Sequence, residues 1–291
     1  MAIPAKFLDY LRLMRADRPI GIYLLLWPTL WGLWFAARGL PGWHVLLVFV
    51  AGTALMRSAG CAINDFADRD FDPHVARTKD RPLAAGRVSP EEAVRLFVAL
   101  SVIAFGLLSS LKNTLALMLA APAAILAAGY PFMKRILSMP QAVLGVAFSW
   151  GIPMAYAAVR HEVVWAEVLP LMIANVCWVI AYDTWYAMVD REDDLKIGVK
   201  SSAILFGRHD RLVIALLHAA ALLLLIQLGL NTGRGPLYFA GIAVAAWLAA
   251  YQQWIARTRE PAACFRAFVH NNWFGLAIFA GLALDHAVAG G

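Results

Sequence analysis

The sequence has few charged residues and few cysteines, and both shortages restrict its class. Only 15% of the 291 residues are charged, whereas 62% are hydrophobic. A soluble domain usually carries about 25% charged and about 45–50% apolar residues, so the composition excludes an ordinary soluble enzyme and a disordered chain. The three cysteines are isolated and form no CxxC spacing. They indicate small buried side chains rather than disulfides or a zinc site.

The sequence contains many long apolar stretches. A helix needs about 20 apolar residues to cross a membrane. We therefore expect an all-α membrane protein of one domain, residues 1–291, with about nine transmembrane helices around a central cavity. Residues 1–18 lack the apolar core of a signal peptide and predict an amphipathic helix on the membrane surface. The apolar stretches are 19–37, 42–63, 94–111, 113–129, 140–159, 167–187, 211–230, 235–256 and 264–287.

The distribution of basic residues predicts the orientation. With the N-terminus in the cytoplasm, the cytoplasmic segments hold 19 lysines and arginines and the opposite loops hold four. The positive-inside rule therefore favours a cytoplasmic N-terminus. The net charge of +6 indicates basic loops beside anionic lipid rather than nucleic-acid binding.

An acidic motif at residues 64–72 follows the second apolar stretch. Asn64, Asp68 and Asp72 are spaced by four residues, so on a helix they share one face, with Asp65 beside them. Like charges at this spacing destabilise a helix, and carboxylates beside a bilayer are costly. The segment therefore requires a cation.

A second acidic motif, residues 183–194, ends the sixth stretch and resembles the first. Asp-Arg-Asp-x-Asp at 68–72 is matched by Asp-Arg-Glu-x-Asp at 190–194, four spans later and in the same orientation. This repetition predicts two pseudo-repeats that face each other across the cavity. The residues that share one helical face in the second motif are Asp183, Tyr186, Asp190 and Asp194.

Two facing sets of oxygen ligands suit Mg²⁺, which keeps several waters and is shared with a substrate's phosphates. A solvated acidic helix end is the alternative interpretation, but it explains neither the shared spacing nor the repetition. The expected metal ligands are Asn64, Asp68, Asp72, Asp190 and Asp194.

Basic residues close to the acidic motifs could, together with Mg²⁺, bind a diphosphate or stabilise it as a leaving group. Arg77 and Lys79 follow the first motif, Lys200 follows the second, and Lys134 lies between the two halves. Topology alone is the alternative explanation for these charges, because this face of the membrane favours basic residues.

These motifs resemble those of the UbiA superfamily of intramembrane aromatic prenyltransferases. Residues 64–72 look like the NDxxDxxxD motif of that family, and residues 190–194 look like its DxxxD motif. The resemblance covers most of the chain up to about residue 210 and is closest to the 4-hydroxybenzoate polyprenyltransferase branch. Further segments that carry it are 18–21, 27–31, 56–61, 77–83, 182–184, 196–201 and 271–273.

The resemblance implies a reaction. A polyprenyl group would pass from polyprenyl diphosphate to the position ortho to the hydroxyl of 4-hydroxybenzoate (its 3-position), with Mg²⁺ as cofactor, in ubiquinone biosynthesis. The enzyme would lie in a bacterial inner membrane with its active site facing the cytoplasm, and it would bind no nucleic acid. Another aromatic acceptor of the same superfamily is the alternative.

Roles follow for individual residues. Asp68, Asp72, Asp190 and Asp194 would act in catalysis with the metal, and Asp183 would take the ring proton or orient the phenol. Tyr182 and Trp185 join Tyr130 and Tyr186 as candidates for cation–π contact with a carbocation, although membrane anchoring explains Trp185 equally well. The residues expected to bind substrate are Arg57, Asn64, Asp65, Arg77, Lys79, Tyr130, Lys134, Tyr186 and Lys200.

Arg57 lies inside the second apolar stretch, where a charge is expensive and therefore indicates function. It precedes Asn64 by seven residues, which is two helical turns or roughly 10 Å. We expect it to bind the acceptor's carboxylate, with Arg18 as a rival at the membrane surface. A structural partnership with a buried carboxylate or with helix-end carbonyls is the alternative.

Two other classes of membrane protein fit less well. A cation-coupled transporter would also have repeated halves and acidic residues, but here the acids lie at the cytoplasmic ends of the helices rather than at the midplane. A CDP-alcohol phosphotransferase would carry a motif that resembles Asp-Gly-x-x-Ala-Arg, and this sequence has no such motif.

Overall fold

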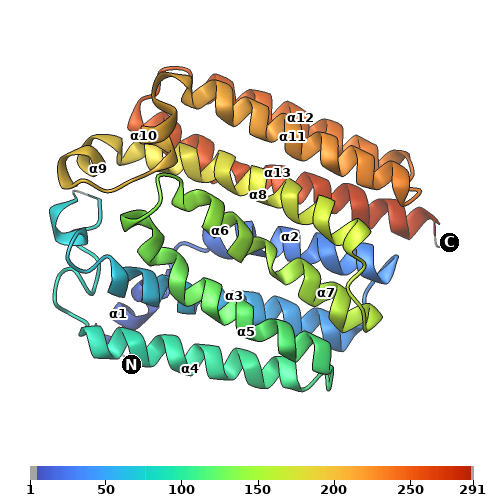
Figure 1. Cartoon of the computed structure of the whole chain (residues 1–291), viewed down its shortest axis with the longest axis horizontal. Helices are drawn as coiled ribbons and strands as arrows, with labels where there is room; N and C mark the ends of the chain where they lie inside the picture. The colour runs from blue at the N-terminus through green and yellow to red at the C-terminus, as the bar shows by residue number, and fades with distance from the viewer. Residues whose placement is uncertain (1–4, 76, 290–291) are drawn as a thin grey trace.

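The computed structural model describes residues 5–75 and 77–289, apart from the side chains of Lys134 and Ala289. The long helices lie side by side along one direction, and the described residues include no strand (Figure 1). The all-α expectation is therefore confirmed. The long helices are α2 (Ile20–Ala37), α3 (Trp43–Ala67), α4 (Pro90–Ser109), α5 (Thr114–Gly129), α6 (Pro140–Ser149), α7 (Gly151–Arg160), α8 (Trp165–Val189), α11 (Asp210–Asn231), α12 (Pro236–Ile255) and α13 (Pro261–Ala289).

Eight helical spans among the described residues are long and apolar enough to cross a membrane. Helices α6 and α7 together form one of them, with a break at Trp150. Helix α12 has the length of a span but is not among the eight. Its sequence includes Gln252 and Gln253, which lower its mean hydropathy. Eight of the nine expected spans are therefore supported among the described residues, and the ninth, at α12, is not confirmed.

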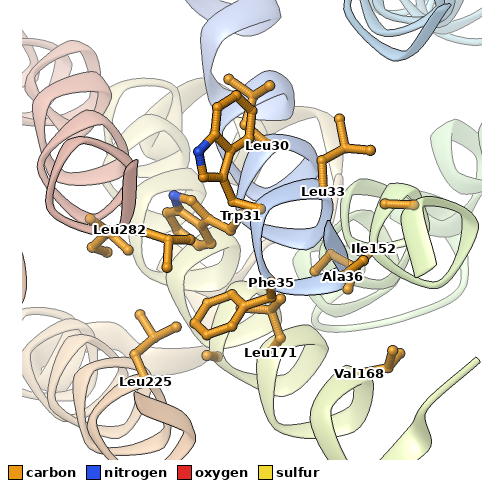
Figure 2. Packing of buried hydrophobic residues seen from close by; sticks show 14 of the residues in the cluster. Leu30, Trp31, Leu33, Phe35, Ala36, Ile152, Val168, Leu171, Leu225 and Leu282 are labelled. Carbon is orange, nitrogen blue, oxygen red and sulfur yellow. The ribbon is translucent and has the colours of Figure 1, made fainter. Parts of the chain in front are cut away.

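Helix α2 lies at the centre of the apolar core. It is hydrophobic on all sides, a pattern typical of a helix surrounded by protein. Trp31, Leu33 and Phe35 have no exposed surface, and they pack against Ile152 of α7 and Leu171 of α8 (Figure 2). By contrast, the outer helices expose large apolar side chains as a lipid-facing surface does. Examples are Val102, Ile125, Leu216, Leu223 and Trp247.

Each acidic motif begins in the last turns of α3 or α8 and continues past the end of that helix. Both helices are 25 residues long, and both end in a non-helical C-cap, Asp68 and Asp190. The single helical face expected for each motif is therefore wrong: Asp72 lies in the short 3₁₀ helix η1 (Asp72–His74), and Asp194 lies in α9 (Arg191–Ile197). Repulsion between successive carboxylates explains the ends of the helices, and a proline after Asp72 disfavours helix there.

Several short helices and connecting segments gather at one end of the bundle, on the left of Figure 1. They include α1 (Ala5–Leu13), η1, α9 and α10 (Ser202–Phe206). The short helices η2 (Tyr130–Arg135) and η3 (Gly207–His209) complete the set.

Helix α1 is attached to this end by polar and apolar contacts. Lys6 pairs with Glu92 at 2.7 Å, and Asp9 pairs with Arg87 at 3.0 Å. Leu13 is buried against an apolar cluster that includes Leu83, whereas Phe7 remains half exposed. The helix is therefore amphipathic, and the protein itself covers part of its apolar face.

Helices α12 and α13 cross at a glycine pair, which generates a prediction. A Cβ atom at Gly241 would lie 2.6 Å from the backbone oxygen of Ala277 and 2.9 Å from Cα of Gly281. Backbone atoms cannot move aside as a side chain can. Gly241→Val should therefore destabilise the protein by about 1–3 kcal/mol, seen as a lower melting temperature in detergent.

Gly106→Ala is the matched control, because a Cβ there meets nothing within 4 Å. An unchanged melting temperature for Gly241→Val would contradict the close crossing of α12 and α13.

Candidate active site

A cavity of about 800 Å³ opens at the end of the bundle where α3 and α8 finish. Both acidic motifs line it, although more than 100 residues separate them in the chain. The acidic and amide side chains in its wall include Asn64, Asp65, Asp68, Asp72, Asp183, Asp190 and Asp194.

The first motif is held in place by hydrogen bonds. The Asn64 amide donates to Asp68 at 3.0 Å and accepts from the Tyr130 hydroxyl at 3.1 Å. Tyr130 comes from η2, between the two halves of the chain. The network therefore fixes the start of the motif from a segment distant in sequence.

Asp65 plays a different part from its neighbours. Its side chain has no exposed surface and accepts two bonds from Arg15, at 2.8 and 3.0 Å, and one from Arg81 at 3.1 Å. Arg81 also bonds Asp72 at 2.8 Å. Two guanidinium groups therefore engage the carboxylate. Through them, Asp65 links α3 to the connector between α1 and α2 and to the loop that follows α3.

Charge in this region is crowded. Burial raises the pKa of Asp72, and the nearby Asp65 and Asp68 act in the same direction, whereas Arg81 opposes them. Arg81 therefore only partly offsets the combined effect of burial and the neighbouring carboxylates on this pKa. A further cation near Asp72 would stabilise its ionised form.

Arg77 joins the two motifs directly. Its Nε atom donates to Asp190 at 2.9 Å, its Nη2 donates to the other oxygen of the same carboxylate, and its guanidinium lies over the Tyr186 ring at 4.6 Å. The pKa of Arg77 is raised above its usual value, with Tyr186 and Asp190 as the groups that raise it. A residue of the first loop thus holds a proposed metal ligand of the second motif.

The other predicted basic residues are placed unequally. Lys200 lines the cavity and donates to the backbone oxygen of Ile136 at 3.0 Å. Lys79 is exposed and lies outside the residues that line the cavity. The side chain of Lys134 lies outside the described part of the structure. Arg18 lines the rim, but three quarters of its side chain is exposed.

Three tyrosines face the cavity: Tyr130, Tyr182 and Tyr186. The Tyr182 hydroxyl is buried and has no hydrogen-bond partner among the described residues. Trp185 has no exposed surface and packs in a separate cluster with Ala181. The two expectations for Trp185, a cation–π contact and a lipid-facing position, are therefore both wrong.

Arg57 lies deeper in the same cavity. Its Nη1 donates to Sγ of Cys61 at 2.7 Å, and its Nε is buried without a partner. Among the described residues no carboxylate lies within ion-pair distance of it. The structural alternative of a buried carboxylate partner therefore finds no support in this part of the chain.

A second, mostly apolar cavity of about 230 Å³ continues from this point. Arg57, Tyr130 and Phe148 line both cavities. The apolar cavity is formed largely by small side chains, so it offers an elongated apolar ligand room between the helices. Its small residues include Gly52, Gly60, Ala120, Ala123, Ala124, Ala127 and Ala147.

The motifs fit a metal that needs few protein ligands. Within the described residues, no three His, Cys, Asp or Glu side chains converge as a preformed metal site would require. Mg²⁺ commonly takes one or two carboxylates and completes its shell with water and substrate phosphates. The acidic oxygens of the cavity wall fit that ion better than a closed structural site.

Several residues of the site were not expected from the sequence. Arg15, Gly21 and Cys61 all line the cavity. No periodicity marks them. Gly21 and Cys61 lie in segments that carry the family resemblance, but only contacts with Asp65 and Arg57 identify the three residues as part of the site.

Comparison with known proteins assigns the chain to a family. Residues 25–277 match the model of the UbiA prenyltransferase family. A protein of Nitrosococcus oceani named 4-hydroxybenzoate octaprenyltransferase is 59% identical over 284 residues, covering 98% of this chain and 99% of the relative. A protein of the same name from Dechloromonas aromatica is 56% identical over 97% of this chain and 95% of its own length.

Solved structures agree with the fold. The apo structure of a UbiA homologue from Aeropyrum pernix K1 has a TM-score of 0.80 and 28% identity, covering 91% of this chain and 97% of that one. A UbiA homologue from Archaeoglobus fulgidus, bound to GPP and Mg²⁺, has a TM-score of 0.67 and 19% identity. The shares covered are 94% of this chain and 99% of that one, and at this identity the likeness concerns the fold alone.

The contact between Arg77 and Asp190 predicts competition with a divalent metal. Arg77→Ala removes the guanidinium from Asp190, so the purified protein without diphosphate should bind Mn²⁺ more tightly. We expect about a fivefold gain, which corresponds to ~1 kcal/mol for a partly exposed pair. The measurement is a titration of free Mn²⁺ by electron paramagnetic resonance.

Arg69→Ala is the charge-matched control, because Arg69 contacts Phe66 and lies 3.8 Å from Asp70. Equal or weaker Mn²⁺ binding by Arg77→Ala, relative to this control, would contradict the competition.

Proposed function

Since this chain belongs to the UbiA prenyltransferase family, we propose that it transfers a polyprenyl group from polyprenyl diphosphate to the 3-position of 4-hydroxybenzoate. The observation that carries the proposal is the meeting of both acidic motifs with Arg57 in one cavity. The names of relatives at 54–59% identity over nearly the whole chain support the acceptor and a polyprenyl donor. The place of the reaction is ubiquinone biosynthesis.

The diphosphate lies between the two motifs in this proposal. Arg77 and Lys200 reach the same cavity as the carboxylates and would bind phosphate oxygens as charged donors. Mg²⁺, held by Asn64, Asp68, Asp72, Asp190 and Asp194, would neutralise the diphosphate and make it a better leaving group. Carboxylate and amide oxygens of this kind suit Mg²⁺, and the neighbour from Archaeoglobus fulgidus was solved with Mg²⁺ and GPP bound.

The apolar cavity takes the first part of the prenyl chain. Its polar mouth, beside Tyr130, places the allylic carbon near the tyrosines, whose rings stabilise positive charge. The walls exclude water, which would otherwise capture the carbocation. Asp183 lines the cavity on α8 and is the residue we assign to take the ring proton or to orient the phenol.

The acceptor binds through its carboxylate at Arg57. The guanidinium is buried, lies in a membrane-spanning helix and has no carboxylate partner among the described residues. An arginine fork holds a carboxylate by two hydrogen bonds, and this would offset the cost of the buried charge.

The proposal also includes the placement of the protein in the membrane. The chain is an integral membrane protein, and we propose nine spans, with α12 as the span of lower hydropathy. A cytoplasmic N-terminus places the cavity on the cytoplasmic side of a bacterial inner membrane, where the basic loops lie. The matched lengths of α3 and α8 support the two pseudo-repeats.

The first test concerns the metal. Each of Asp68→Asn, Asp72→Asn, Asp190→Asn and Asp194→Asn should lower turnover at least about 100-fold, because each removes a charge that stabilises the leaving diphosphate. The assay uses purified protein with labelled polyprenyl diphosphate, Mg²⁺ and 4-hydroxybenzoate, and size-exclusion profiles confirm folding.

Asp70→Asn is the matched control, since Asp70 belongs to the first motif but its side chain is 65% exposed and does not line the cavity. Near-normal turnover of a variant in the second motif would refute the two-motif site.

The second test concerns the acceptor. Arg57→Met should raise the KM for 4-hydroxybenzoate sharply, by the equivalent of about 2–5 kcal/mol, and leave the KM for polyprenyl diphosphate little changed. A panel of aromatic acceptors, including a naphthoate, identifies the preferred ring. Equal weakening toward donor and acceptor would assign Arg57 to structure instead.

A further inference from the structure

The first turn of α2 lies directly against the guanidinium of Arg57. Gly21 is buried and lines the main cavity. A Cβ atom at position 21 would lie 2.3 Å from Nε of Arg57, 2.4 Å from Nη2 and 2.7 Å from Cζ. Real atoms do not approach so closely, so the guanidinium occupies the space that any side chain at position 21 would need.

This guanidinium has no carboxylate partner among the described residues. Its Nε has no partner, its Nη1 contacts only the Cys61 thiol, and the Tyr182 hydroxyl in the same cavity is also without a partner among the described residues. The N-terminus of α2 adds partial positive charge. It has neither a capping side chain nor an acidic residue in its first turn. These groups together favour an anion beside the Arg57 guanidinium.

We propose that Gly21 determines the acceptor specificity of the enzyme. By having no side chain, it allows the Arg57 guanidinium to lie against the start of α2 in the wall of the cavity, where it binds an aromatic carboxylate. The proposal rests on the proposed function and extends it to a residue that touches no substrate. Gly21 therefore acts as a positioning residue, and its effect passes through Arg57.

Gly21→Ala tests the proposal directly. The methyl group would meet the flexible end of Arg57 rather than backbone, so the guanidinium moves and the fold persists. We expect kcat/KM for 4-hydroxybenzoate to fall about tenfold, the scale of coupling between residues in contact. The values for its methyl ester, which has no carboxylate, and the KM for polyprenyl diphosphate should stay unchanged.

Gly106→Ala is the matched control, because its new methyl group meets nothing within 4 Å. It should keep the wild-type ratio between 4-hydroxybenzoate and the methyl ester. A wild-type ratio in Gly21→Ala would overturn the proposal.

A double-mutant cycle separates positioning from a general structural effect. With Arg57→Ala the guanidinium is absent, so adding Gly21→Ala should cause no further loss toward 4-hydroxybenzoate. The double variant should also recover any folding yield that the clash costs the single variant. If the two losses multiply, or if the double variant folds no better than a poorly folding Gly21→Ala, Gly21 acts apart from Arg57.

The wild-type control distinguishes this proposal from the proposed function. If wild-type protein prenylates no 4-hydroxybenzoate, the proposed acceptor is wrong. Calorimetric binding of 4-hydroxybenzoate and of benzoate to wild-type and Gly21→Ala protein then tests the anion site separately. Weaker binding of both by Gly21→Ala supports the positioning role, and equal or absent binding in the two proteins overturns it.

Discussion

The need to neutralise carboxylates at the membrane boundary organises this protein. Buried carboxylates are stable only when they are paired, and here the partners come from the connectors rather than from neighbouring helix turns. Arg15 and Arg81 engage Asp65, Arg81 also engages Asp72, and Arg77 engages Asp190. These pairs draw the loop after α3 over the cavity. The fold of that end of the bundle therefore depends on the charges that the reaction requires.

In the proposed site, the two halves share the acidic helix ends that would hold the metal but not the arginine that would bind the acceptor. Trp43 and Trp165 begin α3 and α8, and 122 residues separate them, as they do Asp68 and Asp190. At the same offset, Arg57 corresponds to the fully buried Val179. A duplication would supply two equivalent acidic ends for one diphosphate, and an arginine in a single half would then create one acceptor site. The asymmetry fits a reaction with one acceptor.

The sequence predicted the helices from their apolar runs, and it predicted the meeting of the acidic motifs from their repetition along the chain. It did not predict where the helices end. Asp68 and Asp190 are C-caps rather than interior positions, since repulsion between carboxylates competes with helix propensity. The roles of Arg15 and Gly21 were also beyond the sequence, because they depend on contacts across 50 and 36 residues of chain.

The junction of the two cavities explains how water-sensitive chemistry can occur beside a solvated acidic site. The diphosphate needs polar surroundings, whereas the prenyl cation needs dry ones. Arg57, Tyr130 and Phe148 line both cavities, so the boundary between the two environments lies at these side chains. A charged group is tolerated at that boundary only if its geometry is fixed and an anion arrives with the substrate. In the proposed mechanism, the glycine of α2 meets the first condition and the carboxylate of the acceptor meets the second. The same arginine can then orient the ring toward the allylic carbon, because its position is fixed before the acceptor binds.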